Sequence, residues 1–311
     1  MALGRVSSVA LHAFDATLVE IEANVGQGLP GVTIVGMADT STREAKDRVR
    51  AAIVNSGFKW PEGRITLSLS PAELRKSGSM FDLALALAVL ATDQISSDRL
   101  RDTVFVGELG LDGRLRGVRG VLPAVVAARR EGKRCAVVPM ANVDEATVVG
   151  GIEVGAAQNL AEVVGWVRGR RTLDTVDASR TREPVTAPAI PDMGDVVGQE
   201  DARYAMEIAA AGAHHLFMTG PPGIGKTMLA RRLPGILPTL TDEESLEVTS
   251  VHSIAGTLSP KRPLITEPPF VAPHHSTSVT ALTGGGTGIA RPGAISLAHR
   301  GVLFLDDANK T

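Results

Sequence analysis

The chain has 311 residues, of which 44% are hydrophobic and 21% are charged. This composition is enough to bury sizeable cores and excludes a disordered or fibrous protein, and the length predicts about two domains. The formal net charge of −2, from 32 basic and 34 acidic residues, predicts no global attraction to nucleic acid or to an anionic membrane.

Several sequence features bear on where the protein resides. The longest strictly apolar run, 83–91, is far shorter than the ~20 residues of a membrane span. His12 and Asp15 interrupt what would be the apolar core of a secretory signal. The single cysteine, Cys135, cannot form an internal disulfide, which favours a reducing compartment. We therefore expect a cytoplasmic protein without a membrane partner.

The first half of the chain alternates short β-branched segments with helical patterns. A helix is expected from about Thr42 to Asn55, because Ser41 and Glu44 have capping-box spacing and Gly57 lies where the helix would stop. Alternating apolar residues and helical periodicity predict the other elements. In chain order these are strands over 16–24 and 64–70, a helix over 81–92, a strand over 103–106, a helix over 122–130, a strand over 135–138 and a helix over 160–167.

Residues 168–192 separate this half from the rest of the chain. They contain charges and three prolines but no sustained periodicity, so we interpret them as a linker. This places one mixed α/β domain at 1–167 and a second domain at 193–311. The second is expected to contain a helix over 202–211, a short buried strand over 215–219 and a helix over 226–233.

A glycine-rich loop joins the last two of these elements. Its sequence, Gly-Pro-Pro-Gly-Ile-Gly-Lys-Thr, satisfies the pattern G-x-x-x-x-G-K-[ST], whose backbone N–H groups cradle phosphate oxygens beside a positive helix end. Lys226 would contact the β and γ phosphates, and the Thr227 hydroxyl would bind Mg²⁺. The residues expected to contact the nucleotide here are Gly220, Pro221, Pro222, Gly223, Ile224, Gly225, Lys226, Thr227 and Met228.

A phosphate site of this kind needs a second carboxylate for its magnesium ion. Residues 302–305 are four apolar residues that predict a buried strand, and Asp306 follows directly. Asp306 is therefore the expected second metal ligand, and Asp307 is the candidate water-activating, catalytic carboxylate. An ordinary strand end would show the same pattern, so this assignment depends on the glycine-rich loop.

Two histidine pairs lie near these motifs without predicting a metal site. His274 and His275 are adjacent, and adjacent side chains point in different directions on a strand or a helix, so the pair makes no chelating face. The same holds for His214 and His215. We expect loop or hydrogen-bonding roles for these residues.

Together the motifs of the second domain resemble those of the magnesium-chelatase-like AAA+ ATPases of the ComM/YifB type. The resemblance extends through 1–167, because members of this type carry a Lon-protease-like, S5-like α+β domain at that position. The motifs that carry it are Val-Val-Gly-Gln at 196–199, the glycine-rich loop, Ala-Pro-His-His-Ser at 272–276, Ala281-Leu282 before the triple glycine 284–286, and 291–299 leading to Asp306.

This resemblance implies an ATP-driven, usually hexameric ring that acts as a DNA helicase and promotes branch migration in recombination. It implies that Gly198 and Gln199 lie near the adenine, and that the glycines at 284–286 belong to a hairpin facing the ring pore. The chain itself offers little direct evidence for DNA contact, because aromatic residues are only 3% of it.

The Lon-like resemblance also raises a serine-lysine peptidase, which the residues argue against. Aligning Gly78 with the glycine of the Lon nucleophile loop puts Met80, a thioether, at the nucleophile position. The position of the catalytic lysine holds Leu122. Ser79 is more plausible as the N-cap of the following helix. We therefore expect a domain without peptidase activity.

The chain departs from the family pattern at its end. Asp307 stands where the family has glutamate, and the chain stops at Thr311, before the sensor strand, the arginine finger and the helical lid. We expect an incomplete P-loop AAA+ α/β core that folds incompletely and binds ATP and Mg²⁺ weakly, with little or no hydrolysis. The alternatives are a chelatase-type motor subunit acting on a metal-insertion partner, and a non-hydrolysing binding remnant.

Overall fold

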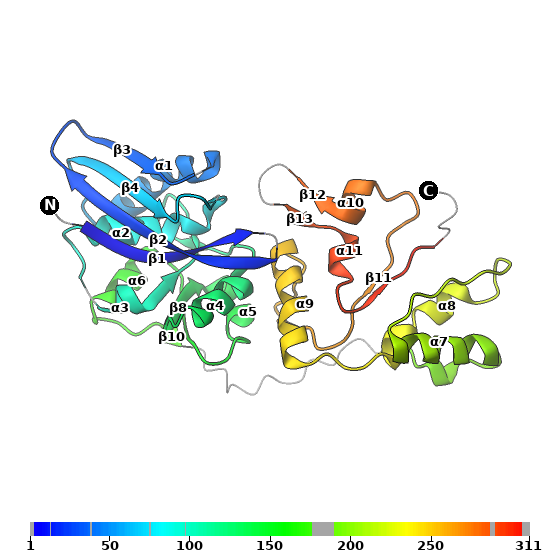
Figure 1. The fold of residues 1–311 in the computed structure, drawn as a ribbon. Helices are drawn as coiled ribbons and strands as arrows, with labels where there is room; N and C mark the ends of the chain where they lie inside the picture. Colours follow the sequence, from blue (N-terminus) through cyan, green and yellow to red (C-terminus); the bar gives the residue numbers. More distant parts are fainter. Residues whose placement is uncertain are drawn as a thin grey trace. The chain divides into compact units, whose positions relative to one another are not determined.

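The computed structural model describes residues 3–12, 14–37, 39–74, 76–96, 98–175, 190–286 and 290–306. The chain forms two compact units, Met1–Thr181 and Arg182–Thr311 (Figure 1). The division falls inside the expected linker, most of which lies outside the described residues. The candidate catalytic residue Asp307 also lies outside them.

In the described part of the first unit, one mixed sheet of eight strands has the order β10-β9-β8-β5-β1-β2-β4-β3. The neighbours β1–β2, β2–β4 and β9–β10 are antiparallel, and the remaining pairs are parallel. The strands are β1 (Leu3–His12), β2 (Asp15–Gly26), β3 (Gly31–Val35), β4 (Arg64–Ser70), β5 (Thr103–Phe105), β8 (Cys135–Pro139), β9 (Glu153–Ala157) and β10 (Asp174–Thr175). A separate ribbon pairs β6 (Glu108–Leu109) with β7 (Leu115–Arg116).

Helices cover both faces of this sheet. A Cβ on Gly4 of β1 would overlap Ala88 of α2, whereas Leu11 of the same strand contacts Gly120 at the start of α4. Positions 4 and 11 point to opposite faces of a strand, so α2 and α4 lie on opposite sides. The helices are α1 (Thr40–Asn55), α2 (Asp82–Leu90), α3 (Asp98–Asp102), α4 (Val121–Arg130), α5 (Val143–Ala146) and α6 (Leu160–Val167).

The long apolar run noted in the sequence forms most of α2. All nine residues of this helix are buried, as expected for a helix that is apolar on every side and lies in a core. Among the helices that the structure describes, none combines the length and the apolar content needed to span a bilayer.

Most elements expected in the first half are confirmed, but the strands β1, β3, β6, β7, β9 and β10 were not predicted. The centre of β1 is buried on both faces, where the Ser8 hydroxyl donates to Phe105 O and the Lys133 ammonium donates to the Ser7 hydroxyl. Burial on both faces removes the alternation that marks a half-buried strand. β3 is a short edge strand of five residues.

Two predicted helix caps are wrong. The cap of α1 is Asp39, whose carboxylate accepts a hydrogen bond from Thr42 N at 2.8 Å, so the helix begins before the expected capping box. Ser79 does not cap α2, because its hydroxyl donates to the Glu108 carboxylate instead. For α1 the capping residue lies earlier in the chain than expected, and for Ser79 the hydrogen-bond partner is a carboxylate far away in the sequence.

The second unit consists of helices with short strand pairs (Figure 1). β11 and β14 pair in parallel, and β12 and β13 form an antiparallel hairpin. The elements are α7 (Glu200–Gly212), α8 (Lys226–Ala230), α9 (Asp242–Ala255), β11 (Phe270–Val271), α10 (Val279–Thr283), β12 (Gly284–Gly285), β13 (Arg291–Pro292), α11 (Ala294–Leu297) and β14 (Val302–Leu303).

The buried strand predicted over 215–219 is not formed. Within the described residues no strand pairs with this segment, and Phe217 is 77% exposed. A strand requires a hydrogen-bonded neighbour, so an apolar run alone does not produce one. The predicted helix over 226–233 is also shorter than expected, since α8 ends at Ala230 and a 3-10 turn covers Leu233–Ile236.

Candidate nucleotide-binding site

The glycine-rich loop curls back on itself before α8. Gly223 and Gly225 have φ values of 83° and 101°, in the left-handed region that glycine adopts without strain. The Lys226 ammonium donates to Gly220 O at 2.8 Å and to Pro221 O at 3.1 Å. Its positive charge therefore lies inside the curve of the loop, against oxygens that a phosphate could replace.

A small apolar cluster packs against α8, the helix that follows the loop. Leu229 of α8 packs with Met193, Val196 and Met206, which come from the segment before α7 and from α7 itself. This cluster brings the predicted Gly198 and Gln199 next to the loop. The Gln199 side chain donates from Nε2 to Ile224 O at 3.1 Å, a contact that sequence reasoning did not anticipate.

The two predicted metal ligands lie side by side. The Thr227 hydroxyl donates to Asp306 Oδ2, with a distance of 3.3 Å between the two oxygens. A hydroxyl and a carboxylate are oxygen ligands of the kind that Mg²⁺ prefers. The structure thus joins the loop motif and the Asp306 motif into one site, although their separation along the sequence is large.

Asp306 owes its place to the pairing of β14 with β11. Val302 N donates to Pro269 O at 2.8 Å, and Phe304 N donates to Val271 O at 2.9 Å, which extends the pairing past the end of β14. The rings of Phe270 and Phe304 stack with their centroids 6.1 Å apart. These contacts hold the backbone up to two residues before Asp306.

The residues present fit a magnesium nucleotide by their chemistry. The loop offers a lysine ammonium beside glycine backbone, and Thr227 with Asp306 offers two hard oxygen ligands. Met228 follows directly in α8 and is 38% exposed, so it lies at the surface of the site. The roles of these residues toward a nucleotide stay predictions.

The histidine pair at 274–275 belongs to a loop, as expected. His274 Nδ1 lies 2.8 Å from the Ser276 hydroxyl, and the two imidazole rings are 4.0 Å apart. In the described parts of the chain, no group of three or more histidine, cysteine or acidic side chains is placed to hold a metal ion.

The glycines at 284–286 do form part of a hairpin. Gly284 pairs with Pro292, and Gly285 pairs with Arg291. A Cβ on Gly293 would overlap the backbone of Gly284, so the close approach of the two strands requires glycine there. The hairpin that the resemblance implied is present, whereas its position in a ring pore stays a prediction.

Comparison with known proteins identifies the family. Residues 192–311 match the family described as magnesium chelatase, subunit ChlI, and residues 21–142 match the family described as subunit ChlI of Mg-chelatase. Competence protein ComM of Haemophilus influenzae is 44% identical over 310 residues, which cover 99% of this chain and 60% of that protein. The chain belongs to the magnesium-chelatase-like AAA+ proteins of the ComM/YifB type.

Other ComM/YifB-type relatives match over the same span. An uncharacterized protein of Mycobacterium tuberculosis, Rv2897c, is 58% identical over 309 residues, or 99% of this chain and 61% of that protein. YifB of Escherichia coli is 41% identical over 308 residues, or 99% of this chain and 60% of that protein. The chain therefore spans about three fifths of the length of these relatives.

This ComM/YifB-type chain also has a partial similarity to Lon proteases. Lon protease 2 of Bacillus subtilis is 33% identical over 131 residues, which cover 40% of this chain and 24% of that protein. Met80, at the nucleophile position of the Lon pattern, is buried in a 3-10 turn, and Leu122, at the lysine position, is buried in α4. The absence of peptidase activity stays a prediction.

Proposed function

We propose that the second unit binds ATP with Mg²⁺, and that the longer protein hydrolyses ATP to drive DNA branch migration as a homo-oligomeric ring. The observation that carries the nucleotide-binding part is the contact between Thr227 and Asp306 at 3.3 Å, beside a glycine loop that surrounds the Lys226 ammonium. An ordinary strand end would have no reason to meet the first turn of α8.

Each residue of the site has a distinct role in this proposal. Backbone N–H groups of Gly223, Ile224 and Gly225 contact the phosphates, and the Lys226 ammonium leaves the loop carbonyls to pair with the β and γ phosphates. Gly198 and Gln199 border the adenine. Thr227 and Asp306 hold Mg²⁺, which would neutralise charge that develops on the phosphates, and Asp307 would orient the attacking water.

The DNA and ring parts of the proposal rest on the family. The relative from Haemophilus influenzae is named a competence protein, and AAA+ proteins commonly act as rings. The hairpin formed by β12 and β13 is the element proposed to face the pore. The single cysteine, Cys135, is free and buried, in keeping with action in the cytoplasm.

For the first unit we propose a Lon-like, S5-like arrangement that serves as an interaction module and does not cleave peptides. The partial sequence match to Lon proteases and the mixed sheet with helices on both faces support this. Ser79, one residue before the Lon nucleophile position, donates a hydrogen bond from its hydroxyl to the Glu108 carboxylate and not to a lysine.

Nucleotide binding is tested by titrating the chain with a fluorescent ATP analogue, with and without Mg²⁺. The wild-type chain should bind, and Lys226→Ala should abolish binding, whereas Lys261→Ala, which removes an exposed lysine of the same unit, should not. Equal affinity of the wild type and Lys226→Ala would remove the loop from the proposal.

The action of the longer protein is tested separately by ATPase assays. Stimulation by branched DNA supports a DNA motor. Stimulation only by a metal-insertion partner would replace this proposal with the chelatase-type motor, and a longer protein that binds but never hydrolyses ATP would favour a binding remnant.

A further inference from the structure

We propose that Arg300 is a positioning residue for the metal site, because its guanidinium holds the turn from which the chain runs to Asp306. This inference rests on the proposed binding of a magnesium nucleotide, and it adds a residue that contacts neither the nucleotide nor the metal. Three sets of contacts join the turn at 297–301 to α9.

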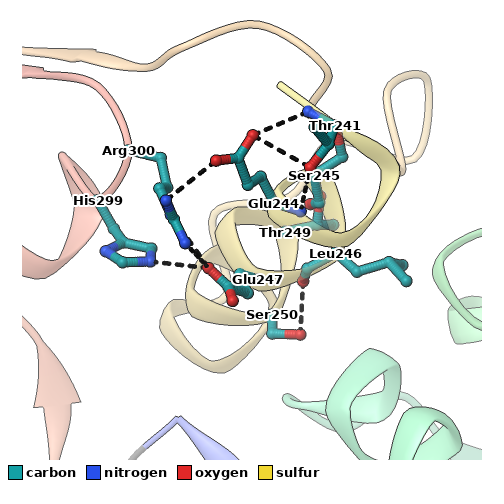
Figure 2. A network of polar contacts seen from close by, with 9 residues as sticks. All are labelled: Thr241, Glu244, Ser245, Leu246, Glu247, Thr249, Ser250, His299 and Arg300. Atoms are coloured by element: carbon teal, nitrogen blue, oxygen red, sulfur yellow. Dashed lines mark hydrogen bonds and ion pairs between the residues drawn. The ribbon is translucent and has the colours of Figure 1, made fainter. Parts of the chain in front are cut away.

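The Arg300 side chain spans two carboxylates of α9 (Figure 2). Its Nη1 donates to Glu244 Oε1 at 3.0 Å and its Nε donates to Glu247 Oε2 at 3.2 Å, while Nη2 lies 3.1 Å from the same Glu247 oxygen. His299 Nε2 also lies 3.3 Å from Glu247 Oε2. Residues three apart share one face of a helix, so both carboxylates meet the planar guanidinium together.

The Glu244 carboxylate is also held by hydrogen bonds that do not involve Arg300. Glu244 Oε2 accepts hydrogen bonds from Thr241 N at 2.9 Å and from the Thr241 hydroxyl at 3.1 Å, which completes the capping box of α9 (Figure 2). These bonds and the charge of Arg300 lower the pKa of Glu244. The carboxylate is therefore both charged and fixed in direction.

The same helix also holds the segment before the turn. His252 Nε2 lies 3.1 Å from Leu297 O, so the end of α11 is attached to α9 as well. Arg300 itself has a φ of 59°, in the left-handed region that a side chain other than glycine rarely adopts. At the next position, a Cβ on Gly301 would overlap Pro269 O. The chain therefore changes direction at 300–301 and enters β14 along one path.

The ion pairs of Arg300 with Glu244 and Glu247 should affect the position of the turn more than the free energy of unfolding. Arg300 and Glu247 are 43% and 51% exposed, and exposed ion pairs contribute little to the free energy of unfolding. In the described residues β14 has one pairing neighbour, β11, so its position depends strongly on the turn that precedes it. Loss of partners that orient metal ligands typically weakens metal binding about tenfold or more.

The test compares Arg300→Ala, Arg300→Gly and Arg300→Lys in the full chain, with Arg262→Ala as the control for a similar exposed arginine-glutamate pair. Affinity for a fluorescent ATP analogue is measured with and without Mg²⁺. Hydrogen exchange of the amides at 302–304 is followed without nucleotide. In Arg300→Ala and Arg300→Gly, Mg²⁺ should raise the affinity for the ATP analogue about tenfold less than in the wild type. The affinity without Mg²⁺ should stay unchanged, and the amides at 302–304 should exchange faster.

The glycine and lysine variants separate the guanidinium from the backbone. Glycine accepts the left-handed conformation, so wild-type behaviour of Arg300→Gly would mean that the turn alone suffices and would overturn the inference. Lysine cannot span two carboxylates, so partial rescue is expected. If the wild type binds the ATP analogue and Arg300→Ala has the same Mg²⁺-dependent affinity, this inference is overturned and the proposed function stands. A wild type without any nucleotide binding overturns the proposed function, and the inference with it.

Discussion

The Thr227 hydroxyl donates a hydrogen bond to Asp306 Oδ2 at 3.3 Å, between residues 79 positions apart. This contact brings the glycine-loop motif and the strand-end carboxylate into one place. Because Mg²⁺ would take its ligands from this pair, removing either oxygen should lower the affinity for a magnesium nucleotide while leaving metal-free binding in place.

Mg²⁺ should raise the affinity for the ATP analogue about tenfold less in Thr227→Ala than in the wild type, because the variant lacks one oxygen ligand. Thr227→Ser keeps a hydroxyl at the same position and should behave like the wild type. Both are compared by titration with a fluorescent ATP analogue over a range of Mg²⁺ concentrations. Equal metal dependence in Thr227→Ala and the wild type would show that this hydroxyl is no ligand.

A buried ion pair predicts an unusual pH dependence for the first unit. Asp82 is fully buried, and Arg48 donates to both of its carboxylate oxygens, at 2.9 Å and 3.1 Å. Burial nevertheless dominates and raises the pKa of Asp82 from 3.8 to about 6. The folded state thus holds this proton more tightly than the unfolded state does.

The sign of the effect follows from this difference. The stabilisation linked to Asp82 is fully present below its unfolded pKa of 3.8 and is lost as the pH rises through about 6. Relative to Asp82→Asn, which does not titrate, the wild type should lose on the order of 3 kcal/mol of unfolding free energy across this window. Fluorescence of the two tryptophans, Trp60 and Trp166, reports the first unit alone during denaturant unfolding. A constant difference between the two proteins would contradict the prediction.

His252 predicts the opposite behaviour for the second unit. Burial lowers the pKa of His252 below 6.5, while its Nδ1 lies 3.0 Å from the Thr257 hydroxyl. Since the unfolded chain takes up a proton that the folded state resists, stability should fall as the pH drops below about 6.5. Compared with His252→Gln at each pH, amides of α9 in the wild type should lose protection on acidification. Hydrogen exchange measures this, and parallel profiles would exclude His252 as the cause.

Gly301 predicts a steric effect on the metal site. A Cβ there would overlap the carbonyl oxygen of Pro269, which also accepts the hydrogen bond from Val302 N at 2.8 Å. Gly301→Ala should therefore displace β14 from β11 and reduce the Mg²⁺-dependent affinity for the ATP analogue. Gly194→Ala places its Cβ in ordinary contact with Asp192 at 3.4 Å and serves as the control. Wild-type affinity in Gly301→Ala would show that β14 tolerates the shift.

The local motifs of this protein were readable from the sequence because each depends on neighbours along the chain. The glycine loop and the helical periodicity of α4 and α6 are short-range patterns. The buried strand expected over 302–305 is only partly formed, because β14 ends at Leu303 and Leu305 is 51% exposed. The resemblance to the ComM/YifB type, which the comparisons confirm, rests on the same kind of local residues.

The predictions from sequence were wrong where a residue or strand far away along the chain decides the local structure. The segment 215–219 has the composition of a buried strand yet pairs with no described strand, and β1 lost its alternation because both its faces are covered. Ser79 has the position of a cap, but the Glu108 carboxylate, 29 residues away, takes its hydroxyl. Local propensity cannot anticipate which groups a fold brings together.

The sequence by itself determined the family, the glycine-rich loop and the identity of both candidate metal ligands, because backbone conformation and ligand chemistry are properties of short segments. Only the tertiary structure decided that Thr227 and Asp306 meet, and that Arg300 is held by two glutamates of α9. Contacts of this kind join residues more than 50 positions apart, and they form only when packing and strand pairing bring the segments together.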